Sequence, residues 1–173
     1  MTVFNCPTSF SQNADPGTCS AVVTYTLPTT DIPSGSMILI TSLGSGDIFP
    51  VGITTVTYEE RDNNNEATGL TCSFNVTVDD DVPPSLVGVP ADVTVECDAI
   101  PTVPTVTATD NCDTTLTVSY SEISNTVVDG IGTIVREWTV TDNGGNTATD
   151  TQTITVIDST DPILVGVPAD VTV

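Results

Sequence analysis

The chain has no histidine and no lysine, and its only basic residues are Arg61 and Arg136. Without histidine, neither a Ser-His nor a Cys-His nucleophile can be assembled, and no carboxylate pair stands out as a glycosidase site. The 23 acidic residues give a net charge of −21, which repels nucleic acid and anionic membranes. No window approaches about 18 consecutive apolar residues, the length of a membrane span. These absences predict a protein that is not an enzyme, binds no nucleic acid and has no membrane span.

Cysteine is present, but not in the patterns of a zinc or thioredoxin-like site. There is no CxxC pair, and histidine ligands are lacking. The five cysteines are Cys6, Cys19, Cys72, Cys97 and Cys112. Disulfide bonds in an oxidising compartment suit this usage better. The sequence therefore predicts a secreted protein, located outside the cell or on its surface.

An exact internal repeat organises the chain. The segment LVGVPADVTV occurs at 86–95 and again at 164–173, a period of 78 residues. The preceding residues correspond without a gap, because NVTVDDDVPP from Asn75 falls on TITVIDSTDP from Thr153. Boundaries are therefore expected near Asp80 and Asp158. We expect one repeat over 1–79, a second over 80–157, and a linker with the first strand of a third over 158–173.

The secondary structure expected is almost entirely β-strand, because Val, Ile and Thr alternate and no stretch has a helical period. Strands are expected at 21–27, 36–43, 54–61, 71–78, 91–97, 105–110, 116–122, 132–142 and 150–158. Turn clusters such as DNNNEATG and DNGGNT separate them. Short strands at this spacing are typical of an antiparallel β-sandwich. Trp138 alternates with polar neighbours and is expected in the core.

Several motifs recur in a specific order. In the first repeat they are NCP at 5–7, DPGTCSAVVTY at 15–25, FPVGITTVTY at 49–58 and TCSFNVTVDD at 71–80. In the second they are GVPADVTVECD at 88–98, TATDNCD at 107–113 and REWTVTDNGGNTATDTQTITVID at 136–158. In this order they resemble the hyalin-repeat (HYR) domain, an immunoglobulin-like module of animal extracellular proteins and large bacterial surface proteins. The second repeat looks like the bacterial variety, which occurs in tandem in Bacteroidetes cell-surface adhesins.

This resemblance implies tandem immunoglobulin-like antiparallel β-sandwiches of about 78 residues each, in an extracellular stalk, fibre or adhesin. It also implies two disulfides, Cys6–Cys72 and Cys97–Cys112. The first repeat reads TTDIPSG where relatives have a TDNC segment. Cys19 is therefore expected to be unpaired or bonded to another chain.

Acidic and amide side chains gather beside proline at both repeat boundaries and in nearby loops. The candidate metal ligands are Asp79, Asp80, Asp81, Asp110, Asn111, Asp113, Asp142, Asn143, Asn146, Asp158 and Asp161. Calcium takes six to eight oxygens from such groups, and clustered carboxylates need a counter-ion that this chain barely supplies. The alternative is that these residues only form turns and cap their own backbone. The hypothesis is that calcium binds the inter-domain junctions and stiffens them, as in the analogous acidic linkers of cadherins.

Three functions remain open from the sequence. The first is a spacer whose partners are the neighbouring repeats of the same chain. The second is a module that binds a surface glycan or protein directly, and the third is a filament subunit that joins other copies by strand addition through 164–173. The exposed Thr-rich faces carry no aromatic or arginine anchor for a partner, which favours the first.

Overall fold

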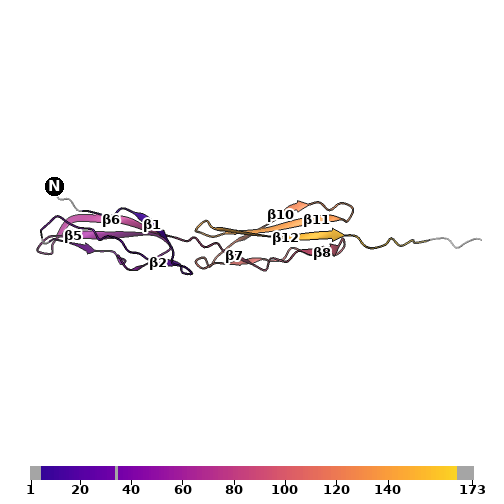
Figure 1. Ribbon diagram of the computed structural model, residues 1–173, viewed down its shortest axis with the longest axis horizontal. Helices are drawn as coiled ribbons and strands as arrows, with labels where there is room; N and C mark the ends of the chain where they lie inside the picture. Colours follow the sequence, from indigo (N-terminus) through magenta and orange to yellow (C-terminus); the bar gives the residue numbers. More distant parts are fainter. Residues whose placement is uncertain (1–4, 34, 167–173) are drawn as a thin grey trace, which may run out of the picture. The chain divides into compact units, whose positions relative to one another are not determined.

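The computed structural model describes residues 5–33 and 35–166, and its secondary structure there is all β (Figure 1). The N-terminal strands are β1 Phe10–Asn13, β2 Ser20–Val22, β3 Ser36–Leu39, β4 Ile48–Pro50, β5 Gly52–Arg61 and β6 Ala67–Asp79. The C-terminal strands are β7 Ser85–Val87, β8 Val93–Glu96, β9 Thr107–Thr109, β10 Val118–Asn125, β11 Gly132–Thr141 and β12 Thr147–Ile157. The prediction of an all-β fold built of sandwiches is confirmed. In the described part of the chain no helix could span a membrane.

The chain divides into two compact units. Unit 1 contains Met1–Ser85 together with two later loops, Ala108–Leu116 and Thr141–Ala148. Unit 2 contains Leu86–Thr107, Thr117–Val140 and Thr149–Val173. The two loops bring acidic side chains from the second half of the sequence into unit 1.

The N-terminal sandwich pairs a four-stranded sheet, in the order β1-β6-β5-β3, with the two-stranded sheet β2-β4. Its core draws on both sheets, because Ala21 and Phe49 pack with Val56, Phe74 and other inward residues of β5 and β6. Strand alternation explains this, since every second residue of β6 from Cys72 to Val78 is buried. Within the sheet β1 runs parallel to β6, whereas the other pairs are antiparallel.

The C-terminal sandwich repeats this plan, with a sheet in the order β10-β11-β12-β8 and a smaller sheet β7-β9. Here β8 runs parallel to β12. Ile134, Ile154 and Val156 form the core cluster. Trp138 is 2% exposed and its ring lies 5.5 Å from that of Tyr120, which confirms its expected place in the core.

A buried cation lies among these apolar residues. Arg136 is 5% exposed, and its Nη2 donates to the carbonyl oxygen of Pro101 at 2.7 Å. Its Nε and Nη1 are buried without a hydrogen-bond partner, as is Oε1 of the buried Gln152. The Thr139–Thr149 and Thr141–Thr147 hydroxyl contacts set the pairing of β11 with β12, and continuing that register places Arg136 opposite Gln152. A polar row therefore interrupts this core.

The disulfides differ in part from the expectation. Cys6 is bonded to Cys72, the pair that the resemblance implies. Cys112 is bonded to Cys19, so Cys19 is neither unpaired nor bonded to another chain, and Cys97 is an exposed free thiol. The expected Cys97–Cys112 bond is therefore wrong.

The physical reason lies in β12. Cys97 follows β8, whose last residue pairs with Ile157 at the end of β12. The loop that holds Cys112 instead bonds Asn143, which precedes β12. The eleven residues of β12 separate the two neighbourhoods, far more than a disulfide can span.

The observed strands lie where alternation is longest, and some short strands were not predicted. β5, β6, β11 and β12 coincide with expected strands, whereas β1, β4 and β7 were missed. The strand expected in the third repeat, 164–173, lies largely outside the described residues. Ile163, Leu164 and Val165, which are described, are each at least 86% exposed.

Candidate cation site

The centre of the site is Asp80, the residue after β6. It is only 7% exposed, although it is charged. Its Oδ1 accepts a hydrogen bond from the backbone N–H of Val82 at 3.2 Å, which turns the chain toward Pro83. A carboxylate this buried in a chain so poor in basic residues calls for a compensating charge.

The second carboxylate is Asp110, which lies in the loop after β9. Its Oδ1 accepts the backbone N–H groups of Cys112 at 2.8 Å and Asp113 at 2.9 Å. Its Oδ2 is buried and has no hydrogen-bond partner. Carboxylate oxygens of Asp80 and Asp110 and the sulfur of Cys112 all lie within 4.8 Å of one another. At that separation two carboxylates repel by about 3 kcal/mol at an effective dielectric near 20.

The loop after β11 lies against Asp80 and is held by its own carboxylates. Asp142 accepts the backbone N–H and the side-chain amide of Asn146, at 2.7 and 2.9 Å. The same Asn146 amide donates to the backbone carbonyl of Asp80 at 2.9 Å. A Cβ at Gly144 would lie 2.8 Å from that carbonyl oxygen, so glycine is needed for this close approach.

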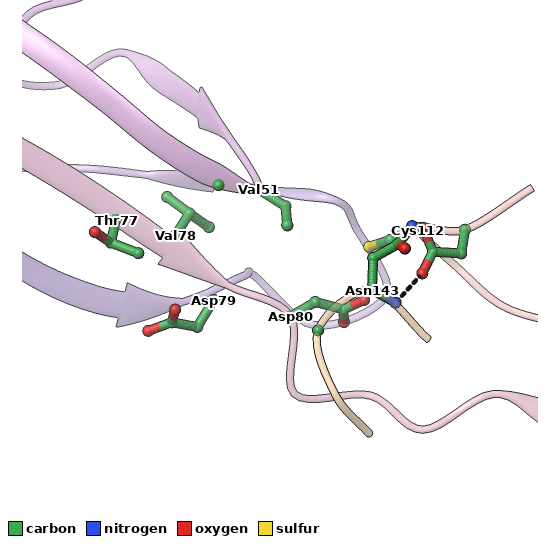
Figure 2. Close-up of a pocket in the computed structure, with 10 residues that line it drawn as sticks. Val51, Thr77, Val78, Asp79, Asp80, Cys112 and Asn143 are labelled. Carbon is green, nitrogen blue, oxygen red and sulfur yellow. Dashed lines mark hydrogen bonds between the residues drawn. The ribbon is translucent and has the colours of Figure 1, made fainter. Parts of the chain in front are cut away.

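A hollow of about 350 Å³ opens beside these groups, lined by Val51, Thr77, Asp79, Asp80, Asp113 and Asn143 among others. Figure 2 shows Asp80 on the side where Cys112 and Asn143 lie, with Asp79 farther back on β6. Asp113 accepts both the backbone N–H and the side-chain amide of Asn143.

The donor set fits calcium and not a soft metal. Asp80 and Asp110 offer hard carboxylate oxygens, and Oδ2 of Asp110 has no other partner. Both oxygens of Asp113 instead accept hydrogen bonds from Asn143. The sulfur of Cys112 is already bonded to Cys19 and is no calcium ligand. Arg61 pairs with Glu59 and Arg136 donates to Pro101, so among the described residues no basic side chain neutralises this cluster.

The structure does not bring all predicted ligands together. Asp81 accepts a hydrogen bond from the Asn13 side chain. Asn111 is exposed and donates to the carbonyl oxygen of Thr18 at 3.4 Å. Asp79 lines the hollow but is exposed on β6.

The second boundary is organised differently. Asp158 accepts the backbone N–H of Thr160 at 3.1 Å and so caps its own turn, and Asp161 is exposed. The Ser159 hydroxyl and N–H both donate to the Glu96 carboxylate and hold its pKa below the usual range. Within the described residues these acids do not form a cluster like that around Asp80.

Sequence reasoning missed Cys19 as part of this neighbourhood. Cys19 and Cys112 are 93 residues apart, and neither spacing nor alternation indicates that they meet. The one available signal was that the expected pairing left Cys19 without a partner.

Two known families match successive parts of the chain. Residues 1–78 match the HYR domain, and residues 86–156 match the HYR-like domain with 4 cysteines. Within the second range this chain has only Cys97 and Cys112.

The curated relatives include hyalin from two animals. Hyalin of Lytechinus variegatus is 37% identical over 162 residues, covering 88% of this chain and 30% of that protein. Hyalin of Strongylocentrotus purpuratus is 33% identical over 169 residues, covering 91% of this chain and 14% of that protein. The chain thus spans less than a third of either relative. The bacterial variety expected from the sequence has no support from these relatives.

Solved structures of cadherin repeats are distantly similar. Human mucin-like protocadherin EC1-2 is 15% identical, with a TM-score of 0.38 over 92% of this chain and 99% of that chain. Protocadherin gamma B2 extracellular cadherin domains 3–6 are 17% identical, with a TM-score of 0.40 over 91% of this chain and 52% of that chain. Similarity this low carries no argument about the site.

Proposed function

The chain consists of HYR-type repeats, and on that premise we propose that it is a structural segment of an extracellular stalk, fibre or adhesin that calcium stiffens. Its partners are then neighbouring repeats and, through them, other proteins or copies at the cell surface. The disulfides Cys6–Cys72 and Cys19–Cys112 support an oxidising, extracellular location. The likeness to hyalin supports an adhesion-related role, and none of the residues gathered in the site forms a nucleophile and base pair.

The single observation that carries the calcium proposal is the buried, partnerless Oδ2 of Asp110 beside the buried Asp80 carboxylate. Calcium would remove their mutual repulsion and occupy the oxygen that has no donor. Asp80 would hold the ion from the end of β6, and Asp110 from the loop after β9. Because these ligands come from distant parts of the sequence, binding would limit movement of that loop relative to β6.

The first test is calorimetric unfolding in excess calcium and in excess EDTA. A ligand that binds only the folded state stabilises it by about 2.7 kcal/mol at one hundred times its Kd, so the midpoint should rise clearly with calcium. Asp80→Asn combined with Asp110→Asn should abolish that rise. Asp98→Asn is the matched control, because Asp98 is exposed and outside the cluster. An unchanged midpoint in the unaltered protein would refute calcium binding.

Stiffening needs its own measurement. Small-angle scattering of the same protein should give a narrower distribution of dimensions with calcium than with EDTA. If calcium raises the unfolding midpoint but leaves scattering unchanged, the ion stabilises unit 1 without acting as a stiffener.

Strand addition is a second candidate function. In the C-terminal sandwich, the first copy of LVGVPADVTV contributes to β7, which pairs with β9, and to β8, which pairs with β12. Ile163, Leu164 and Val165 precede or begin the second copy and are almost fully exposed. Sedimentation of the protein with and without 159–173 tests this, because only the longer form should associate.

A further inference from the structure

We propose that the Cys19–Cys112 disulfide is a redox control on the cation site. Reduction would lower the affinity of the Asp80–Asp110 cluster for calcium, and bound calcium would protect the disulfide from reduction. The inference rests on the proposed function only in taking calcium as the ligand.

The disulfide and the cluster share one short loop. Cys112 donates its backbone N–H to the Asp110 carboxylate at 2.8 Å. The Cys112 sulfur lies within 4.8 Å of carboxylate oxygens of both Asp80 and Asp110. Any movement of Cys112 away from Cys19 therefore moves Asp110 relative to Asp80.

Two contacts hold this loop. Asp113 accepts the backbone N–H and the side-chain amide of Asn143, and Cys112 is bonded to Cys19. Beside Cys19 the noncovalent contact is weak, because the Asn111 amide reaches the Thr18 carbonyl at 3.4 Å in an exposed position. The disulfide is therefore the main anchor of the loop beside Cys19, and its reduction would leave Asp110 held chiefly through Asp113 and Asn143.

Both residues of this bond are partly accessible. Cys19 and Cys112 are half-buried, and the adjacent Thr18 is exposed. In the other disulfide Cys6 is also half-buried, but Cys72 is 1% exposed within the N-terminal core. A soluble dithiol can approach either residue of Cys19–Cys112 but only the Cys6 side of the other bond, so it should reduce Cys19–Cys112 faster.

The reaction is an ordinary exchange. A thiolate of the dithiol attacks one sulfur and forms a mixed disulfide, and its second thiolate then displaces the remaining protein sulfur. Cys19 and Cys112 gain two electrons and two protons as thiols, and the reductant becomes a cyclic disulfide. Coupling between the two sites is reciprocal for binding free energies. If reduction lowers the calcium affinity by a given factor, bound calcium therefore disfavours reduction of the disulfide by the same factor.

We expect reduction to weaken calcium binding about tenfold. This corresponds to the free energy of ordering about one additional backbone residue when calcium binds. A tenfold change in a two-electron exchange corresponds to about 30 mV in reduction potential. Both quantities can be measured on the whole chain.

The experiment begins with a thiol count in denaturant, which should find one thiol, that of Cys97. Three thiols would overturn the inference, because the control would not exist. Calcium titration calorimetry then compares the oxidised protein, the protein treated with mild dithiol, and the Cys19→Ser/Cys112→Ser variant. The last two should bind about tenfold more weakly. Cys97→Ser is the matched control and should bind like the oxidised protein.

A second measurement guards against a variant that fails to fold. The oxidised protein is equilibrated in mixtures of oxidised and reduced dithiothreitol, with calcium or with EDTA, and its reduction potential should be about 30 mV lower with calcium. Equal calcium affinity in oxidised and reduced protein, with equal potentials, would overturn the redox control while leaving the proposed calcium site intact. Absence of calcium binding in every form would instead refute the proposed function, and the inference with it.

Discussion

Removing the Cys6–Cys72 disulfide should destabilise unit 1 severely. Its cysteines are 66 residues apart, and closing a loop of that length in the unfolded chain is worth about 4 kcal/mol in the chain-entropy model. Cys72 is also in the core, with 1% of its surface exposed, so Cys6→Ala/Cys72→Ala leaves a small cavity as well. At roughly 1 kcal/mol per molar urea for a small domain, the midpoint should fall by about 4 M.

Two optical signals make the test specific. Trp138 is the only tryptophan and lies in unit 2, so its fluorescence reports on unit 2. Far-UV circular dichroism reports on all strands. We expect the variant to lose part of its dichroism at low urea while the Trp138 transition shifts much less.

Cys97→Ala is the matched control, because this exposed thiol forms no bond, and its midpoint should change by less than about 0.5 kcal/mol. The reasoning is refuted if the double variant loses less than about 1 kcal/mol. A Trp138 transition that shifts as far as the dichroism would contradict the separate response of the two units.

Three further predictions concern single residues. Arg136→Met should raise the free energy of unfolding by about 1–3 kcal/mol in urea denaturation, since two buried guanidinium nitrogens lack partners. A decrease in the free energy of unfolding would contradict this reasoning. Burial and the hydrogen bond with Tyr58 raise the pKa of Tyr25. The stabilising contribution of its protonated hydroxyl is therefore fully present below about pH 10 and is lost as the pH rises further. Tyr25→Phe should flatten that fall in pH-dependent thermal melts, and an unchanged slope would refute the cause. Gly132→Ala should cost about 2–4 kcal/mol, because its Cβ would lie 2.6 Å from a backbone oxygen; Gly46→Ala, with open space around it, should cost less in the same melts.

Long alternating runs explain how much of the fold was predictable. β5 and β11 each span ten residues whose buried positions alternate, so a local pattern was enough to locate them. β4 has three residues and β1 four, and such strands are specified by their partners more than by their own sequence.

The sequence singled out acidic residues, but it could not say which of them meet. The candidates beside proline and in the nearby loops included Asp80 and Asp110, whose carboxylates the structure brings within 4.8 Å of each other. Which acids meet depends on where β6 ends and how the loop after β9 returns to it, and no local pattern contains that information. The same limit explains the Cys19–Cys112 bond. Arg136 differs, because alternation places it on the same buried face as Trp138, although an arginine is ordinarily exposed.

The Cys19–Cys112 bond has a mechanical consequence. It encloses β2 to β9, which all lie between its two cysteines in the sequence. Tension applied along the chain can pass from Cys19 across the bond to Cys112, so the enclosed strands need not carry the load. The protein can lose its fold under tension, but it cannot lengthen by the chain enclosed within the bond.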